Sequence, residues 1–570
     1  MKLKEGGRTF VGPVRAGAVR QGGDGYRYDS TVKLKTDSPV PRRAAGRPGP
    51  PRLRRLLAGA CVCALAALAT APGAGIAQQL KPNNNSLPNL GDSARGDLSP
   101  LIERKLGEEI MRDVRRDRDF LDDDAILEYL NNFGSALVAA YPGARGETGA
   151  DFYFFAVRDP MLNAFALPGG FIAVHSALVI AAQNESELAS VLSHEIGHVT
   201  QRHIARMIGQ QKQDALMPLA ALILAALASK AGPDAAVGVF MGGQGLAIQR
   251  QLNFSRDAER EADRVGFQIM DAAGFDTSGM VAFFQRMQSA TKVYSDLTPP
   301  WLMSHPLSSE RITDIRARIR EAPFRQRVDG LEFHLVRARA RVLQDESAQG
   351  RIDAAAAFEA QLKLQSRQQQ AAGHYGLALL ALRKAELATA GERLAKARAT
   401  MKPTTGAVFS TGQSTSDGAA MFASLSLDIK LAPGQPATLG SQTLKEAEQA
   451  YQQFPLSRGI ARQYAQAMIA SGMLEQAVAF LREEVRLYRE EPKLYDLLAK
   501  TYAAQGKQTL QHIALAESYV LSGAVPAAVD QLGIARKASD ASFYDLALID
   551  ARERELSERV REEKKEKKEK

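Results

Sequence analysis

The chain of 570 residues carries a formal net charge of +9, but its basic side chains are concentrated at the N-terminus. Residues 1–77 hold 14 Lys and Arg against 4 Asp and Glu, a net charge of +10, so the remainder is close to neutral at −1. The high overall pI therefore gives no support for nucleic-acid binding, and no basic stripe with interleaved aromatic side chains adds any. The length is sufficient for two folded domains.

An export signal is the first predicted element. Residues 56–76 form an apolar run rich in Ala and Leu, with three arginines just before it and small residues at its end, a pattern typical of a secretory signal peptide. We interpret residues 1–77 as leader and signal peptide, in which the first fifty residues are a disordered extension or result from a start codon placed too far upstream. Both cysteines lie inside the apolar run, so the mature chain needs no disulfide in an oxidising compartment.

A helix that carries a metal-binding motif is predicted next. Asn184 is placed to cap it, and apolar residues recur at helical spacing up to residue 196. The sequence His-Glu-Ile-Gly-His places His194 and His198 four residues apart, hence on one face, with Glu195 beside them. Two imidazoles and a carboxylate base in this pattern indicate one Zn²⁺ per chain and a hydrolytic reaction.

The uncharged run at residues 215–228 is too short to span a membrane. Two interpretations remain open for it. It is either a buried core helix, or a segment that lies over the cleft or makes a peripheral contact with a membrane surface.

A third metal ligand is expected on the helix predicted after residue 254. Glu259 and Asp263 are four residues apart and share one face, whereas Glu261 points roughly the other way. One carboxylate of the pair can bind the metal while the other orients a ligating histidine. In isolation, such a run would be a solvated helix face, but the upstream motif makes the metal interpretation stronger.

These motifs together resemble the gluzincin metallopeptidases related to the CAAX prenyl protease and HtpX. The resemblance covers about residues 95–325 and implies a zincin-like fold. It implies His194, His198 and Glu259 as metal ligands, Glu195 as catalytic base and Asp263 as the residue that orients a ligand.

The resemblance extends to two further segments. Residues 163–175 look like the family's hairpin beside the active-site helix, which implies that an edge strand there pairs with extended substrates. Its residues expected to bind substrate are Asn163, Phe165, Gly169 and Gly170. The pair His305-Pro306, with Arg311 five residues after the proline, looks like the family's C-terminal element.

The role of His305 has three alternatives. In relatives, a histidine here either donates a hydrogen bond to the tetrahedral oxyanion or occupies the fourth metal position as a removable plug. The third alternative is a purely structural histidine. We predict that His305 lies within reach of the metal and gates it in the resting enzyme.

Beyond residue 330 the composition shifts to short helical blocks rich in Ala, Leu, Glu, Gln and Arg. Two blocks end in Gly472 and Gly506, thirty-four residues apart, which is the period of tetratricopeptide repeats. The alternative is an undifferentiated helical domain. Residues 402–442, rich in Thr, Ser, Gly and Pro, interrupt the array as a long loop or a divergent repeat.

We therefore predict a mainly α protein. It consists of a zincin-like α+β metallopeptidase domain with a small β-hairpin or sheet at residues 78–330, an α-solenoid of tetratricopeptide-type repeats at residues 331–555, and a charged tail at residues 556–570. Stacked helical hairpins form a surface suited to extended peptides or partner proteins.

An exported gluzincin followed by such repeats is similar to a family of periplasmic enzymes of Gram-negative bacteria that act on outer-membrane proteins. The similarity implies degradation of misassembled outer-membrane proteins, assistance to productive ones, and contact of the repeats with the barrel-assembly machinery. Two other functions stay open. One is a chaperone or adaptor with a normally silent zinc site, and the other is a membrane-anchored metallopeptidase whose signal is not cleaved.

Overall fold

The computed structural model describes residues 98–146, 149–210, 256–293, 300–402, 418–435 and 440–569. The predicted leader and the apolar run at residues 215–228 lie outside the described residues. Among the helices that are described, none is both long enough and apolar enough to cross a lipid bilayer.

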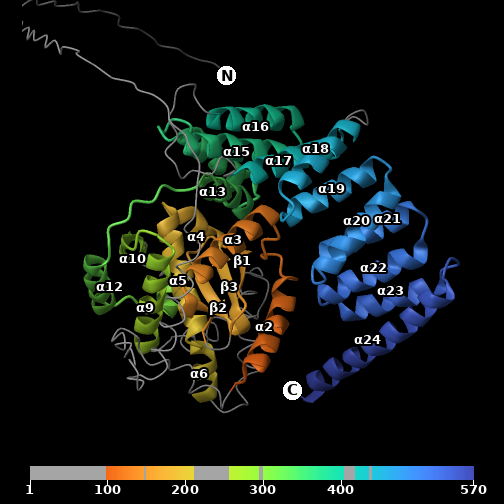
Figure 1. The fold of residues 1–570 in the computed structure, drawn as a ribbon, viewed down its shortest axis with the longest axis horizontal. Helices are drawn as coiled ribbons and strands as arrows, with labels where there is room; N and C mark the ends of the chain where they lie inside the picture. The colour runs from red at the N-terminus through yellow and green to blue at the C-terminus, as the bar shows by residue number, and fades with distance from the viewer. Residues whose placement is uncertain are drawn as a thin grey trace, which may run out of the picture. The chain divides into compact units, whose positions relative to one another are not determined.

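The described part is mainly helical with one small sheet, as the sequence predicts (Figure 1). The elements up to residue 321 are α2 (Pro100–Val114), α3 (Asp124–Ala140), η2 (Pro142–Arg145), β1 (Tyr153–Val157), β2 (Ala164–Leu167), η3 (Pro168–Gly170), β3 (Phe171–His175), α4 (Ser176–Ala181), α5 (Glu185–Thr200), α6 (His203–Gln210), α9 (Arg256–Ala272), α10 (Ser278–Val293), α11 (Pro300–Ser304) and α12 (Ser309–Glu321).

A second group of helices follows the connection at residues 322–330 (Figure 1). They are α13 (Leu331–Gln344), α14 (Ala348–Gln361), α15 (Arg367–Arg383), α16 (Leu387–Met401), α17 (Ala419–Leu431), α18 (Gly440–Gln453), α19 (Arg458–Ala470), α20 (Leu474–Leu487), α21 (Pro492–Ala504), α22 (Gln508–Leu521), α23 (Val525–Lys537) and α24 (Phe543–Glu569). We call α13 to α24 the helical repeat region.

The sheet has the strand order β1-β3-β2, with β3 parallel to β1 and antiparallel to β2. Strands β2 and β3 form the hairpin expected at residues 163–175, in which Ala166 pairs with Ile172. Strands β1 and β2 each have β3 as their one strand neighbour within the described residues, so β2 is an edge strand.

Both faces of the sheet are covered by helices. Successive side chains of a strand point to opposite faces. Phe155 and Phe171 accordingly pack with α2, whereas Phe154 and Ile172 pack with α3 and α5. The sheet therefore lies between α2 on one side and α3 with α5 on the other (Figure 1).

Helices α5 and α9 approach each other closely at two glycines. A Cβ atom on Gly197 would lie 2.9 Å from the carbonyl oxygen of Ala262, and one on Gly266 would lie 3.0 Å from the backbone nitrogen of His194. Any side chain at these positions would push the helices apart. The glycines thus permit the approach that brings the carboxylates of α9 to the histidines of α5.

Helical hairpins repeat through the second part of the chain. Gly472 separates α19 from α20 and Gly506 separates α21 from α22, and each has a φ of +75°. Glycine adopts this left-handed conformation without the steric cost that a Cβ atom adds. The thirty-four-residue spacing seen in the sequence therefore corresponds to equivalent turns of successive hairpins.

Two details of the repeat region bear on the sequence expectation. Part of the stretch at residues 402–442, expected as a long loop or a divergent repeat, is the helix α17, because Met421, Phe422 and Leu425 provide it with a buried apolar face. The predicted boundary at residue 555 falls inside α24, where Leu556 is buried.

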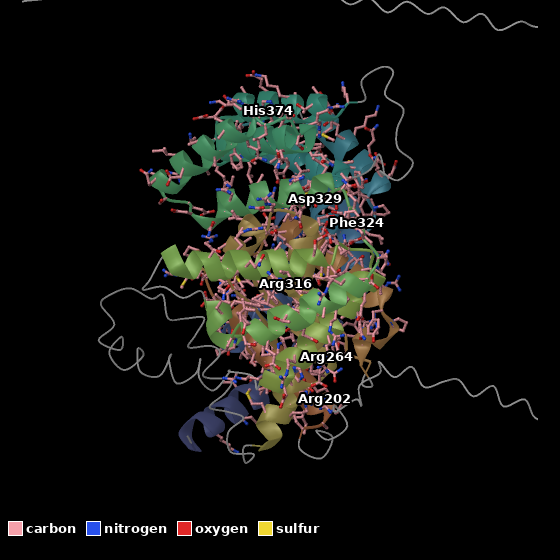
Figure 2. The ribbon with its side chains drawn as sticks, turned by 90° about the vertical axis from the view of Figure 1, so that its left-hand side faces the viewer. Arg202, Arg264, Arg316, Phe324, Asp329 and His374 are labelled. Carbon is pink, nitrogen blue, oxygen red and sulfur yellow. The ribbon has the colours of Figure 1, made fainter. Side chains whose placement is uncertain are left out.

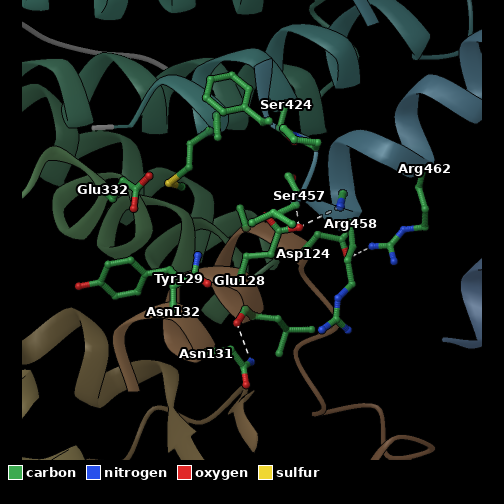
Figure 3. Close-up of a pocket in the computed structure, with 18 of the residues that line it drawn as sticks. Asp124, Glu128, Tyr129, Asn131, Asn132, Glu332, Ser424, Ser457, Arg458 and Arg462 are labelled. Carbon is green, nitrogen blue, oxygen red and sulfur yellow. Dashed lines mark hydrogen bonds and ion pairs between the residues drawn. The ribbon is translucent and has the colours of Figure 1, made fainter. Parts of the chain in front are cut away.

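The helical repeat region shares a hydrophobic core with the part that contains the sheet. One continuous cluster of buried side chains joins α3, α5, α9 and α10 to α13, α15 and α17. Beside it, a cavity of about 540 Å³ lies between α3 and the residues around α19 (Figure 3). At its edge, Arg462 is paired with Asp124, and Glu128 accepts a hydrogen bond of 2.9 Å from the backbone nitrogen of Gly459.

Candidate active site

Helix α5 begins as the sequence predicts and is buried along its whole length. The Asn184 side chain accepts a hydrogen bond of 2.9 Å from the backbone nitrogen of Glu187, which caps the helix. The Glu187 carboxylate in turn accepts one of 2.7 Å from the backbone nitrogen of Gln183. Fixed in this way, α5 presents His194 and His198 on one face, both at most 1% exposed.

Four side chains from three segments converge next to this face. His194, His198, Glu259 and His305 each offer a ligand atom, and these atoms all lie within 4.8 Å of one another. We call these four residues the metal cluster. The structure therefore brings the three predicted ligands together, with His305 within reach as also predicted.

Most of the ligand atoms of the metal cluster lie 2.9–3.5 Å apart. The Nε2 atoms of His194 and His198 are 3.1 Å apart, and Nε2 of His194 is 3.3 Å from Nδ1 of His305. The Glu259 carboxylate oxygens lie 2.9 Å from Nδ1 of His305, 3.4 Å from Nε2 of His198 and 3.5 Å from Nε2 of His194. Ligands about 2.0–2.1 Å from a tetrahedral zinc ion are separated by about 3.3 Å. The donor set and its spacing thus fit a divalent metal such as zinc.

Glu195 lies beside the metal cluster. Its Oε2 accepts a hydrogen bond of 3.1 Å from the backbone nitrogen of Ala166 in the edge strand, and its Oε1 accepts one of 3.2 Å from Nε1 of Trp301. Nε2 of His305 lies 3.6 Å from the same Oε1. Two donors and His305 therefore hold this carboxylate in a completely buried position.

Asp263 lies behind His194 and does not belong to the metal cluster. Its Oδ1 is 3.0 Å from Nδ1 of His194, so Nε2 of that ring is left to face the cluster. Arg311 donates to both Asp263 oxygens, at 2.6 and 2.8 Å, and its Nη1 lies 2.8 Å from Glu259. One guanidinium thus holds the carboxylates of Glu259 and Asp263 in register.

His203 is a residue that the sequence analysis missed. Its Nδ1 lies 2.8 Å from Nδ1 of His198, and its Nε2 lies 3.0 Å from a carboxylate oxygen of Glu261. Glu261 also accepts a hydrogen bond of 2.7 Å from Arg206. Glu261 is outside the metal cluster, as expected from its position on α9, but it is buried and connected to His198 through His203.

A sharp change of chain direction at Arg202 places His203 there. Arg202 has a φ of +52°, which is uncommon for any residue with a side chain. Its guanidinium is buried against the Glu103 carboxylate at 3.2 Å and the Leu98 carbonyl oxygen at 2.5 Å, so α2 supports the strained conformation. The residue lies at the start of α6 (Figure 2). In the sequence, the one available signal for His203 was its position five residues after His198. The contacts of Arg202 that place His203 beside His198 cannot be inferred from that spacing.

Burial and neighbouring charges shift the pKa values of the two site carboxylates in opposite directions. Burial raises the pKa of Glu195, and His305 only partly offsets this. Burial also acts to raise the pKa of Glu259, but the surrounding histidines outweigh it and hold the pKa well below its usual range. Glu259 is thus suited to bind a cation, and Glu195 to exchange a proton.

The pKa values of His194 and His198 are also shifted in opposite directions. Burial lowers the pKa of His194, but hydrogen bonds with Asp263 and Glu259 outweigh it and raise the pKa to about 9. Burial lowers the pKa of His198 well below its ordinary value, and the positive charges of His194 and His203 add to this effect. His198 is therefore neutral and has a lone pair for a ligand bond.

The four residues predicted to bind substrate lie at two different places in the structure. Asn163 and Phe165 lie at the edge strand, next to Ala166. The atoms nearest to Gly169 and Gly170 belong to α2 and to the backbone of Asp151, so the structure does not bring these two glycines to the metal cluster.

Comparisons with known proteins agree with this geometry. Residues 136–319 match the model of peptidase family M48. The beta-barrel assembly-enhancing protease of Yersinia pestis is 30% identical over 487 residues, which cover 85% of this chain and 95% of that protein. The protein of the same name from Escherichia coli K12 is 29% identical over 489 residues, with the same coverage. A putative one from Vibrio cholerae is 40% identical over 253 residues, 44% of this chain and 51% of that protein.

The fold, the metal cluster and the family match define a metallopeptidase of family M48. The chain belongs to the family of beta-barrel assembly-enhancing proteases.

Proposed function

We propose that this protein is a zinc-dependent endopeptidase of the bacterial envelope that degrades misassembled outer-membrane proteins and assists the assembly of others. The observation that carries the proposal is the convergence of His194, His198 and Glu259 next to a buried Glu195. In this proposal the three converging residues hold one Zn²⁺ per chain.

The chain's own residues account for the proton transfers. Zinc, when bound, supplies a Lewis acid that polarises the scissile carbonyl and lowers the pKa of water. Glu195 removes the proton from the attacking water and delivers it to the leaving amine, a role suited to its raised pKa. The raised pKa of His194 means that its Nε2 gives up a proton when a metal binds there, while Asp263 keeps the remaining proton on Nδ1.

His305 is proposed to gate the site in the resting enzyme. Its Nδ1 lies 2.9 Å from Glu259 and 3.3 Å from His194, where a fourth ligand would stand. A site with four protein ligands is closed, whereas hydrolysis requires an open position. Removal of His305 is therefore expected to raise basal proteolysis. If His305 instead donates to the oxyanion, the same change lowers turnover by about a hundredfold or more.

His203 and Glu261 are proposed to position His198. Glu261 accepts the proton on Nε2 of His203, which leaves Nδ1 of His203 to accept from Nδ1 of His198. This order of protons leaves Nε2 of His198 unprotonated toward the metal. A carboxylate thus supports each of the two ligating histidines, Asp263 for His194 and Glu261 for His198.

Substrates are proposed to bind as an extended strand beside β2. The backbone N–H of Ala166 points away from β3 toward Glu195, so the free edge of the sheet faces the catalytic carboxylate. Pairing through main-chain hydrogen bonds gives affinity with little dependence on side chains. Asn163 and Phe165 are proposed to contribute to this surface.

The helical repeat region, proposed to be of tetratricopeptide type, would hold clients and contact the barrel-assembly machinery. Support comes from the hairpins of α19 to α22 and from the names of the relatives. The proposed location is the periplasm of a Gram-negative bacterium.

One experiment tests the function directly. Glu195→Gln should retain metal and hold clients without cleaving them, so mass spectrometry of the bound proteins should identify outer-membrane proteins that wild-type protein degrades. If the same clients bind but wild-type protein does not cleave them, the chaperone or adaptor is favoured instead. The four converging side chains support this alternative, because four protein ligands would close the metal site. N-terminal sequencing of mature protein would separate a cleaved signal from a membrane anchor.

A further inference from the structure

Basic side chains gather on one face of α13, away from the metal cluster in the sequence. His334, Arg337 and Arg341 are spaced three and four residues apart, so they stand above one another on the helix. Together with Phe358 and Gln361 of α14, they line a pocket of about 280 Å³. Leu364 and Gln369 complete its wall. We call it the α13 pocket.

Several donors in the α13 pocket lack a partner. Arg341 makes no hydrogen bond or ion pair with any residue that the structure describes. Arg337 donates from Nη2 to the Ile180 carbonyl oxygen at 3.0 Å, but its buried Nε has no acceptor there. His334 is only 5% exposed, and its Nδ1 is also without a partner among the described residues. Buried polar atoms normally have partners, so these two buried nitrogens, together with the half-buried Arg341 beside them, indicate a missing ligand.

The charge of this pocket is incompletely balanced by the protein. The Asp329 carboxylate lies 4.0 Å from Nε2 of His334 and already accepts a hydrogen bond of 2.8 Å from the backbone nitrogen of Glu185. It stands on the connection that precedes α13 (Figure 2). Glu187, which also attracts Arg337, is paired with Arg286.

The pKa directions agree with an excess of positive charge. Burial and the charge of Arg341 lower the pKa of Arg337, and burial and the charge of Arg337 lower that of His334 to about 4. Arg337 and Arg341 are like charges four residues apart on one helix, an arrangement that destabilises the helix unless an anion lies between them.

We propose that the α13 pocket binds a carboxylate of an acidic polypeptide segment. Arginine presents a planar fork that matches a carboxylate, and Gln361 and Gln369 add neutral donors. The pocket is smaller than a typical small-molecule site, so it accommodates one side chain or chain end. Phe358 and Leu364 provide an apolar wall for the methylene groups that carry the carboxylate. The site lies on the repeat region and is independent of the metal chemistry.

The test measures binding of a fluorescein-labelled hexaglutamate peptide to the full-length protein by fluorescence anisotropy at low salt. Arg341→Gln is expected to weaken binding by at least about tenfold, because a charge-assisted pair is lost. Lys363→Gln removes the same charge at an exposed neighbour outside the pocket and should change binding less than about twofold. A hexaglutamine peptide should not bind.

Further arms distinguish the possible outcomes. Because Arg341 has no partner to lose, Arg341→Gln should leave the melting temperature unchanged or raise it, so weak binding cannot be ascribed to unfolding. Inorganic phosphate that binds more tightly than the peptide, with the same dependence on Arg341, would overturn the polypeptide ligand in favour of a small oxyanion. Equal weakening by Arg341→Gln and Lys363→Gln, or no binding of hexaglutamate, would overturn the site itself.

Discussion

Buried charged side chains gather in two regions of this protein, and the two are arranged differently. Where α3 meets the helical repeat region, carboxylates face cations. Asp123 lies 2.6 Å from Nε of Arg339, and Asp124 is paired with Arg462. In the metal cluster, three imidazoles surround one carboxylate, and the Nε2 atoms of His194 and His198 are only 3.1 Å apart.

The difference separates structural from functional use of buried charge. The pairs at α3 neutralise each other and need nothing further, so their role is to join two parts of the chain. Three imidazoles and one carboxylate whose ligand atoms converge on one point have the composition and spacing of a site for a metal cation. Burial and shifted pKa values occur in both regions, so they do not by themselves identify the active site.

The largest effect is expected at α3. Arg339→Ala should lower the free energy of unfolding by about 3–5 kcal/mol, because it leaves Asp123 buried without its counter-charge and removes a hydrogen bond of 2.9 Å to Tyr375. Guanidinium denaturation followed by circular dichroism measures it, with the exposed Arg320→Ala as control. A loss below about 1 kcal/mol would show that the junction does not depend on this pair.

A loss of about a hundredfold or more in peptide hydrolysis, equivalent to about 2.7 kcal/mol in the barrier, is expected for Glu195→Gln. Metal content should remain near one ion per chain, since Glu195 is outside the metal cluster. Steady-state cleavage of an unfolded protein and metal analysis measure the two quantities. The exposed Glu321→Gln is the matched control, and near-native turnover in Glu195→Gln would contradict the proposed base.

Ligand and positioning residues should differ in their effect on metal affinity. Glu259→Ala should lower the metal-binding constant by at least about tenfold. His203→Phe should lower it by about tenfold, because a residue that holds a metal ligand in place contributes that much. The metal-binding constant is measured by competition with a chelator. His203→Gln should restore much of the affinity, because an amide can also accept from His198 and donate to Glu261. Failure of this rescue, with normal stability, would argue against the positioning role.

The smallest effect is expected in the α13 pocket, whose charges are neither paired nor convergent on a metal. His334 titrates near pH 6.5 in the unfolded chain but only near about 4 in the folded one. The unfolded state therefore binds more protons between these values, and the free energy of unfolding should fall as the pH decreases from 6.5 to 4. In His334→Phe, the decrease in the free energy of unfolding should be about 1–2 kcal/mol smaller than in the wild type. Chemical denaturation at several pH values measures it. Parallel pH profiles would contradict the assignment.

Most of the site could be predicted because its key spacings are local. The four-residue separations in His194 and His198, and in Glu259 and Asp263, define one face on each of two helices. Asn184 and Glu187 likewise cap α5 through a contact between residues three apart. What could not be predicted is how Arg311 joins both carboxylates of α9, since that depends on how α12 packs.

Local spacing predicts the metal-binding motif, the helices that carry it and the period of the repeats, since these depend on contacts within a few residues of the chain. The return of His203 to His198 depends on long-range packing, because Glu103 and Leu98 of a distant segment stabilise the conformation of Arg202. Packing also decided that the repeats share a hydrophobic core with the sheet and its helices. Such contacts join residues about a hundred or more positions apart, and no local spacing encodes them.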